Sequence, residues 1–172
     1  MKNFLLGVFT TLAVLATDTF CYLLLGFAEV RGDHPGSALE TRLMRAAVHA
    51  SVRRHAPEMP NPVAPTDDNL IAAIKVYGQH YAICHGTAKG DPSASPVAKG
   101  LYPRPPQLAT DGLEDDPEGF SYWKIKHGIR WTGMPSWKGT LTDQQIWNLA
   151  LFLKHMDKLP PAAEQAWQNV VN

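Results

Sequence analysis

The sequence predicts an all-α protein in which one N-terminal transmembrane helix precedes a domain of three or more helices. Three observations support this fold class: a long apolar run at the N-terminus, apolar residues at helical spacing behind Ser, Thr or Asp caps, and Gly- and Pro-rich stretches between those helical segments. The expected divisions are a membrane helix over residues 1–29, a connector over 30–65, a helical domain over 66–160 and a C-terminal tail over 161–172.

Composition limits both the number of domains and the classes of partner. A chain of 172 residues, 45% of them apolar, has room for one modest domain with appendages. Lys and Arg together number 16, as do Asp and Glu, so the chain lacks the basic excess of a nucleic-acid-binding protein. The only cysteines are Cys21 and Cys84, one in the apolar run and one beside a histidine, which excludes a disulfide framework.

The N-terminal run is interpreted as a signal anchor in the inner (cytoplasmic) membrane. Residues 4–28 carry no charge except Asp18 and would form roughly 37 Å of helix, enough to cross a bilayer. The alternative is a cleaved signal peptide, which would leave residues 20–27 as an exposed apolar stub. Asp18 is costly in lipid unless it is paired, so it either contacts another membrane helix or is tolerated near a bend or a water defect.

The connector is expected to hold a short amphipathic helix and an extended spacer. Ser37 and Glu40 have the spacing of a capping box, and Leu39, Leu43, Ala46 and Ala50 then recur on one stripe, which predicts a helix over about residues 38–54. Four prolines among residues 56–65 favour an extended segment that separates the domain from the membrane without joining its core.

Three helices are expected in the domain, with a loop after each of the first two. Thr66 or Asp67 caps a first helix that continues to Cys84 and His85. A second helix begins near residues 116–118 and ends at Gly128, and a third begins at residues 142–143 and stops before the prolines at 160–161. The long loop over residues 86–106 is typical of a segment that serves a site.

The two loops carry the candidate metal ligands. The stretch Tyr81-Ala82-Ile83-Cys84-His85 is one cysteine short of the haem-attachment pattern C-x-x-C-H, and Met134 follows about fifty residues later between Gly133 and Pro135. A histidine and a methionine are axial ligands that a low-spin haem iron takes. The alternatives are that His85 is an ordinary surface or core histidine and that Met134 is core filler or part of a plain turn.

Residues 69–159 resemble a class I c-type cytochrome of the membrane-anchored bacterial kind. The resemblance rests on the following features: Tyr77, Cys84-His85-Gly86, Pro103-Arg104-Pro105-Pro106, Gly133-Met134-Pro135 and Ile146-Trp147. It implies a cytochrome c-like domain around one haem c, with His85 and Met134 on the iron and Cys84 as covalent attachment. It further implies that the carbonyl of Pro106, or of Pro105, accepts the ring N–H of His85, and that Ala73 meets Trp147 or Phe152 where the first and last helices cross. Four aromatic residues are interpreted as packing and as the wall at the haem edge: Tyr122, Trp123, Trp131 and Trp137.

Tyr81 departs from the family because it stands where the first cysteine should be. A tyrosine forms no thioether, so at most Cys84 attaches the haem. Three interpretations follow: a working haem protein with one thioether, a protein altered by a Cys-to-Tyr change, and a former cytochrome that is now a structural subunit.

The expected function is one-electron transfer between a redox donor and an acceptor protein. Haem attachment implies that the domain lies on the periplasmic or extracytoplasmic side, although the Arg residues after the span argue mildly against export. The protein could also be one subunit of a membrane complex. Two other classes stay open: an enzymatic or gas-sensing haem protein in which Met134 dissociates, and a haem-poor structural or assembly subunit.

Overall fold

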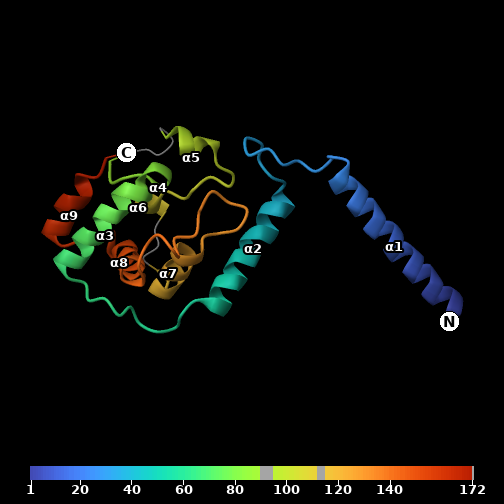
Figure 1. Ribbon diagram of the computed structural model, residues 1–172, viewed down its shortest axis with the longest axis horizontal. Helices are drawn as coiled ribbons and strands as arrows, with labels where there is room; N and C mark the ends of the chain where they lie inside the picture. Colours follow the sequence, from blue (N-terminus) through green and yellow to red (C-terminus); the bar gives the residue numbers. More distant parts are fainter. Residues whose placement is uncertain (90–94, 112–114, 172) are drawn as a thin grey trace. The chain divides into compact units, whose positions relative to one another are not determined.

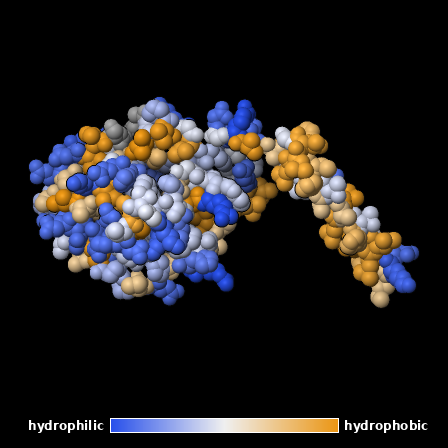
Figure 2. Space-filling model, in the orientation of Figure 1, coloured by the Kyte–Doolittle hydropathy of each residue, from blue (hydrophilic) through white to orange (hydrophobic). Residues whose placement is uncertain are grey.

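A computed structural model describes residues 1–89, 95–111 and 115–171. The described residues contain helices and no strand, which confirms the all-α fold class. The chain divides into two units, Met1–His34 and Pro35–Asn172. The first unit contains α1 (Lys2–Leu24), which has no buried residue and is long and apolar enough to cross a membrane. Its surface is mostly apolar in Figure 2.

The second unit is built from helices packed in pairs (Figure 1). Its elements in chain order are α2 (Ala38–His55), α3 (Asp67–His80), α4 (Ala82–His85), α5 (Pro96–Gly100), α6 (Leu108–Asp111), α7 (Glu118–His127), α8 (Asp143–His155) and α9 (Pro161–Gln168). Helix α8 is central because α3 and α7 both pack against it, and α9 packs on α3. Helices α2, α3 and α8 begin behind the caps that the sequence predicts: Ser37 accepts a hydrogen bond from the backbone of Glu40, Thr66 accepts one from the backbone of Asn69, and Thr142 forms a full capping box with Gln145.

The core is centred on an aromatic cluster. Tyr77 lies edge-on to Phe152 and to Trp167, with ring centroids 5.5 and 5.2 Å apart, and all three side chains are buried. Ala73, expected at the crossing of the first and last helices, is completely buried, as is Phe152. The residues expected to form a C-terminal tail thus include a helix, α9, whose Trp167 completes the core.

Trp167→Ala is expected to destabilise the second unit by about 3–5 kcal/mol, because it removes a buried indole and leaves a cavity beside Tyr77 and Phe152. Denaturant unfolding of the full chain measures this change in the free energy of unfolding. Val171→Ala, at an exposed position after α9, is the matched control and should change it by less than about 0.5 kcal/mol. Equal stabilities of the two variants would show that α9 is not part of the core.

The connector differs from its expected form because it packs on the domain. Val52 on α2 is only 2% exposed, and Val63 in the proline segment belongs to the core. The side-chain amide of Asn61 donates hydrogen bonds to Glu118 at 2.9 Å and to the carbonyl of Trp147 at 3.1 Å. These contacts hold the proline segment against α7 and α8, so it is not a free spacer.

The first domain helix is also shorter than expected. Helix α3 ends at His80, and Tyr81 has φ −113° and ψ −36° before the single turn of α4 begins. The sequence predicts one continuous helix up to Cys84 and His85, and the break at Tyr81 shows that this prediction is wrong. The loop over 86–106 contains the short helix α5, and its residues 90–94 lie outside the described residues.

Candidate haem site

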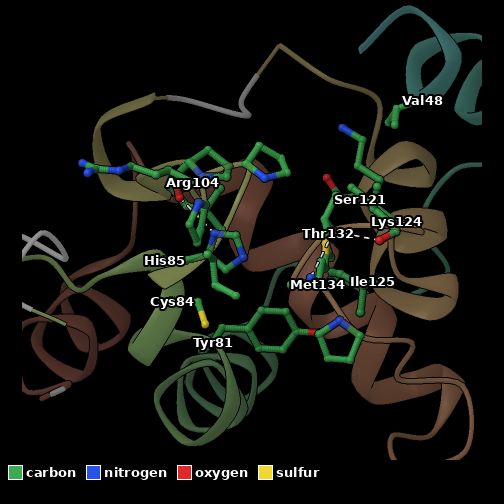
Figure 3. Close-up of a pocket in the computed structure, with 18 of the residues that line it drawn as sticks. Val48, Tyr81, Cys84, His85, Arg104, Ser121, Lys124, Ile125, Thr132 and Met134 are labelled. Atoms are coloured by element: carbon green, nitrogen blue, oxygen red, sulfur yellow. Dashed lines mark hydrogen bonds between the residues drawn. The ribbon is translucent and has the colours of Figure 1, made fainter. Parts of the chain in front are cut away.

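The second unit encloses a cavity of about 300 Å³ with mostly apolar walls. That volume lies at the low end of the range for small-molecule sites. The walls come from α2, the α3–α4 junction, residues 101–108, α7 and the loop of residues 129–137. The predicted site residues that line it are Tyr81, Cys84, His85, Pro106 and Met134. Segments about fifty residues apart in the sequence thus meet at one cavity (Figure 3).

The orientation of His85 is fixed by a backbone carbonyl. Nδ1 of His85 lies 2.9 Å from the carbonyl oxygen of Pro106, the contact implied by the cytochrome resemblance. A carbonyl can only accept, so Nδ1 carries the hydrogen and Nε2 keeps its lone pair. Burial lowers the pKa of His85, which favours the neutral form needed for a metal ligand. Nearby, the Tyr77 hydroxyl donates to the carbonyl of Gly86 at 2.9 Å, which fixes the end of α4.

Met134 lies on a loop held by its own hydrogen bonds. Its backbone N–H donates to Oγ1 of Thr132 at 3.1 Å, and its carbonyl accepts from the backbone of Ile129 at 3.1 Å. A Cβ added at Gly133 would lie 2.5 Å from the side chain of Leu101, so a larger residue here would have to displace that leucine. In Figure 3, His85 and Met134 reach the cavity from opposite walls. This arrangement presents a nitrogen and a sulfur ligand toward a shared space.

Cys84 and Tyr81 line the cavity on the same side as His85. Cys84 has a free thiol, and burial raises its pKa, so the protonated form is favoured. The ring of Tyr81 is 4% exposed and packs between Tyr77 and Trp137, with centroid distances of 5.9 and 5.2 Å. Burial also raises the pKa of Tyr81, and its hydroxyl has no hydrogen-bond partner among the described residues.

The residues present fit a haem by the chemistry of their donors. The cavity has apolar walls, a neutral imidazole and a thioether on opposite sides, and one thiol next to the imidazole. The hydroxyl of Tyr81 and Nε1 of Trp137 are both buried and have no hydrogen-bond partner among the described residues, as expected for donors beside a space that a polar group or water would share. Arg104 and Lys124 also line the cavity, and the ammonium of Lys124 pairs with Asp116 at 3.1 Å.

The sequence predicts Trp123 and Trp131 as packing or haem-edge residues. Neither lines the cavity. Trp123 stacks against His55 of α2, with ring centroids 6.2 Å apart, because α2 covers this face of α7. Trp131 is 79% exposed and has φ 60°, so the turn that carries it points its indole away from the core.

Trp137, one of the four aromatic residues that the sequence predicts for packing and for the haem-edge wall, lines the cavity. His49 and His80 also line the cavity. Helical spacing could not reveal His49, because its place at the cavity depends on the packing of α2 against the domain.

Two comparisons with known proteins found similarity to this chain. Residues 71–153, just under half of the chain, match the family model described as cytochrome C oxidase, cbb3-type, subunit III. None of the curated proteins compared with the chain matches it. A solved chain from the reducing HAO-like protein complex of Kuenenia stuttgartiensis is similar at 24% identity and a TM-score of 0.44, covering 54% of this chain and 45% of that one. This chain therefore spans less than half the length of that relative.

The family match covers the cavity-lining segments that carry Tyr81, Cys84, His85 and Met134. It does not test the replacement of the first cysteine by tyrosine. The resemblance to c-type cytochromes is thus confirmed at the level of the domain, and the protein contains a cytochrome c domain within an all-α fold.

Proposed function

We propose that this protein is a membrane-anchored one-electron carrier whose single haem is ligated by His85 and Met134 and attached to Cys84 by one thioether. The observation that carries the proposal is the pair of side chains facing one cavity: a histidine with its Nδ1 hydrogen given to Pro106, and a methionine on a fixed loop opposite. The cytochrome c domain supports an electron-transfer haem protein.

The residues around the cavity bind and orient, and they have no catalytic role. A bound haem would supply a one-electron iron couple, and His85 and Met134 are the residues that would hold its iron. Pro106 holds the imidazole in one tautomer and one ring orientation. Apolar residues such as Ile125 and Leu101 exclude water, which favours a constant environment for the iron in both oxidation states.

The partners follow from the anchor and the charge. Helix α1 would hold the chain in the inner membrane as a single-pass protein, with the haem domain on the periplasmic or extracytoplasmic side. A net charge of zero provides no strong electrostatic steering, which suits exchange with a redox donor and acceptor held in the same membrane or complex. Asp18 lies in α1 and could contact another membrane helix of such a complex.

One observation favours a second candidate, a haem-poor structural or assembly subunit. The ring of Tyr81 stands at the missing attachment position and lines the cavity itself. In this alternative the cytochrome fold is kept for its contacts with other subunits, and the cavity holds no cofactor.

A reduced pyridine haemochrome spectrum of the purified full chain separates the two candidates. The proposed carrier should show an α-band between the bands of free protohaem and doubly attached haem, because one vinyl group remains. Tyr81→Cys completes the C-x-x-C-H motif and should move the band to the doubly attached position. Tyr81→Phe is the matched control and should leave the band unchanged. A colourless wild-type protein, from a host that matures other c-type cytochromes, would exclude the carrier function.

A further inference from the structure

Helix α2 has two apolar faces, and only one of them packs on the domain. Val52 is buried and Val48 lines the cavity, while the hydroxyls of Thr41 and Tyr102 share a hydrogen bond of 3.1 Å. Leu43 and Leu39 are each nine positions from Val52 and Val48, which is two and a half turns. They therefore lie on the opposite side of the helix.

That opposite side is exposed. Leu39 and Leu43 are 66% and 55% exposed, and Ala46 and Ala50 continue the same stripe. We call these four residues the outer stripe of α2. The sequence predicted this stripe as the apolar side of an amphipathic helix, but the domain packs on the other side. Leu39 and Leu43, one turn apart, thus form an exposed apolar strip on this face of the helix.

Basic residues border the outer stripe on both sides. Arg42 and Arg53 follow Leu39 and Ala50 by three positions, and Arg54 follows Ala50 by four. None of these three guanidinium groups forms an ion pair in the part of the chain that the structure describes. Glu40 is the only acidic residue of α2, against four arginines. In Figure 2 hydrophobic and hydrophilic surface adjoin over this helix.

We propose that the outer stripe of α2 binds the surface of an anionic lipid bilayer. Apolar side chains flanked by arginines are the composition of helices that lie at the headgroup boundary, where the leucines enter the acyl region and the guanidinium groups pair with phosphate. Residues 25–37 connect α1 to α2 and reach at most about 45 Å when extended, so an anchored chain keeps α2 close to a membrane. This proposal rests on the membrane anchor proposed for α1.

The consequence is a fixed orientation of the cavity. Because Val48 and His49 of α2 line the cavity, a bilayer bound to the opposite face would lie about one helix diameter, roughly 10 Å, beyond that wall. The cytochrome domain would then lie on the membrane surface, presenting its cavity to partners in the same membrane.

Hydroxyl-radical footprinting of the full chain tests the proposal. The chain is inserted into nanodiscs of phosphatidylcholine alone, or of phosphatidylcholine with phosphatidylglycerol. Oxidation of Leu39 and Leu43 should fall several-fold in the anionic discs relative to detergent micelles. Ile83, an aliphatic residue of α4 that is 49% exposed, is the internal reference and should keep its rate. Equal oxidation of Leu39 and Leu43 in anionic discs and in micelles would overturn the proposal.

Two charge variants sharpen the test. Combined Arg42→Gln, Arg53→Gln and Arg54→Gln should abolish the protection, because each basic residue near an anionic surface contributes roughly fivefold to binding. The same three positions changed to Lys keep the charge and should keep the protection. Protection that persists in the Gln variant, or that appears only in discs holding two copies, would assign the stripe to a protein contact and contradict lipid binding.

Failure of the anchor is measured separately. The haem spectrum and the intact mass are recorded on the same sample, so loss of haem or removal of α1 is seen independently of the footprint. If α1 is removed during maturation, the mature chain is footprinted with vesicles of the same two compositions. Unprotected leucines on those vesicles would overturn the α2 proposal, and protected ones would support it without the anchor.

Discussion

Cys84→Ser is expected to abolish covalent haem attachment, so that all haem is extracted from the denatured protein by acidified solvent. Cys84 is the only cysteine at the cavity, and Tyr81 forms no thioether. No second thioether bond is therefore available to retain the haem in this variant. The measurement is the intact mass of the chain together with haem staining after denaturing electrophoresis.

The chain provides a matched control in its other cysteine. Cys21 lies in α1, remote in sequence from the cavity, and Cys21→Ser should retain haem at the wild-type level. Retention of covalent haem in Cys84→Ser would show that another residue forms the bond and would remove Cys84 from the site. Loss of haem from both variants would indicate a defect in membrane insertion or maturation unrelated to attachment.

At Tyr81, haem attachment and core packing favour different residues: attachment favours a cysteine, and packing favours the large ring. Its ring fills space between Tyr77 and Trp137, so removing it from the haem-free protein leaves a cavity that costs about 2–4 kcal/mol. The buried hydroxyl has no hydrogen-bond partner in the part of the chain that the structure describes, and burial of an unpaired hydroxyl costs about 1–3 kcal/mol. Comparing Tyr81→Phe with wild type in haem-free and haem-bound forms would thus show whether the bound group supplies the missing hydrogen-bond partner.

The sequence predicts the helices best where capping and periodicity are both local. Thr66 and Thr142 begin helices as expected because their hydroxyls accept from backbone groups three residues ahead. The break at Tyr81 has no such signal, since apolar residues continue at helical spacing through it. It depends on how the ring of Tyr81 packs against Trp137, a residue more than fifty positions away.

Distant contacts also explain where else the structure differs from the sequence predictions. Trp167 and Val52 complete the packing of the second unit through contacts that no local pattern specifies, so the tail and the connector were expected to be separate from the core. The outer stripe of α2 was recognised from its spacing, but spacing cannot tell which apolar residues of a helix face the domain. The contact between His85 and Pro106 was expected only through the resemblance to cytochromes.

Met134→Ala is expected to leave the haem bound through Cys84 while lowering its reduction potential by on the order of 0.1 V or more, within the roughly 0.8 V range that axial ligands span. A thioether stabilises the reduced iron more than a water or an imidazole does, so its loss favours the oxidised form. Potentiometric titration measures the shift, and the charge-transfer band of methionine-ligated ferric haem should disappear from the visible spectrum.

The geometry of the cavity also predicts what replaces Met134. His49 and His80 both line the cavity, so an imidazole can reach the vacated position, and the variant combined with His80→Ala shows which histidine does so. Met156→Ala is the matched control because Met156 is a buried core methionine that does not line the cavity. It should lower stability by about 2–5 kcal/mol and leave the potential unchanged. An unchanged reduction potential in Met134→Ala would show that Met134 does not bind the iron, because the loss of an iron ligand changes the potential.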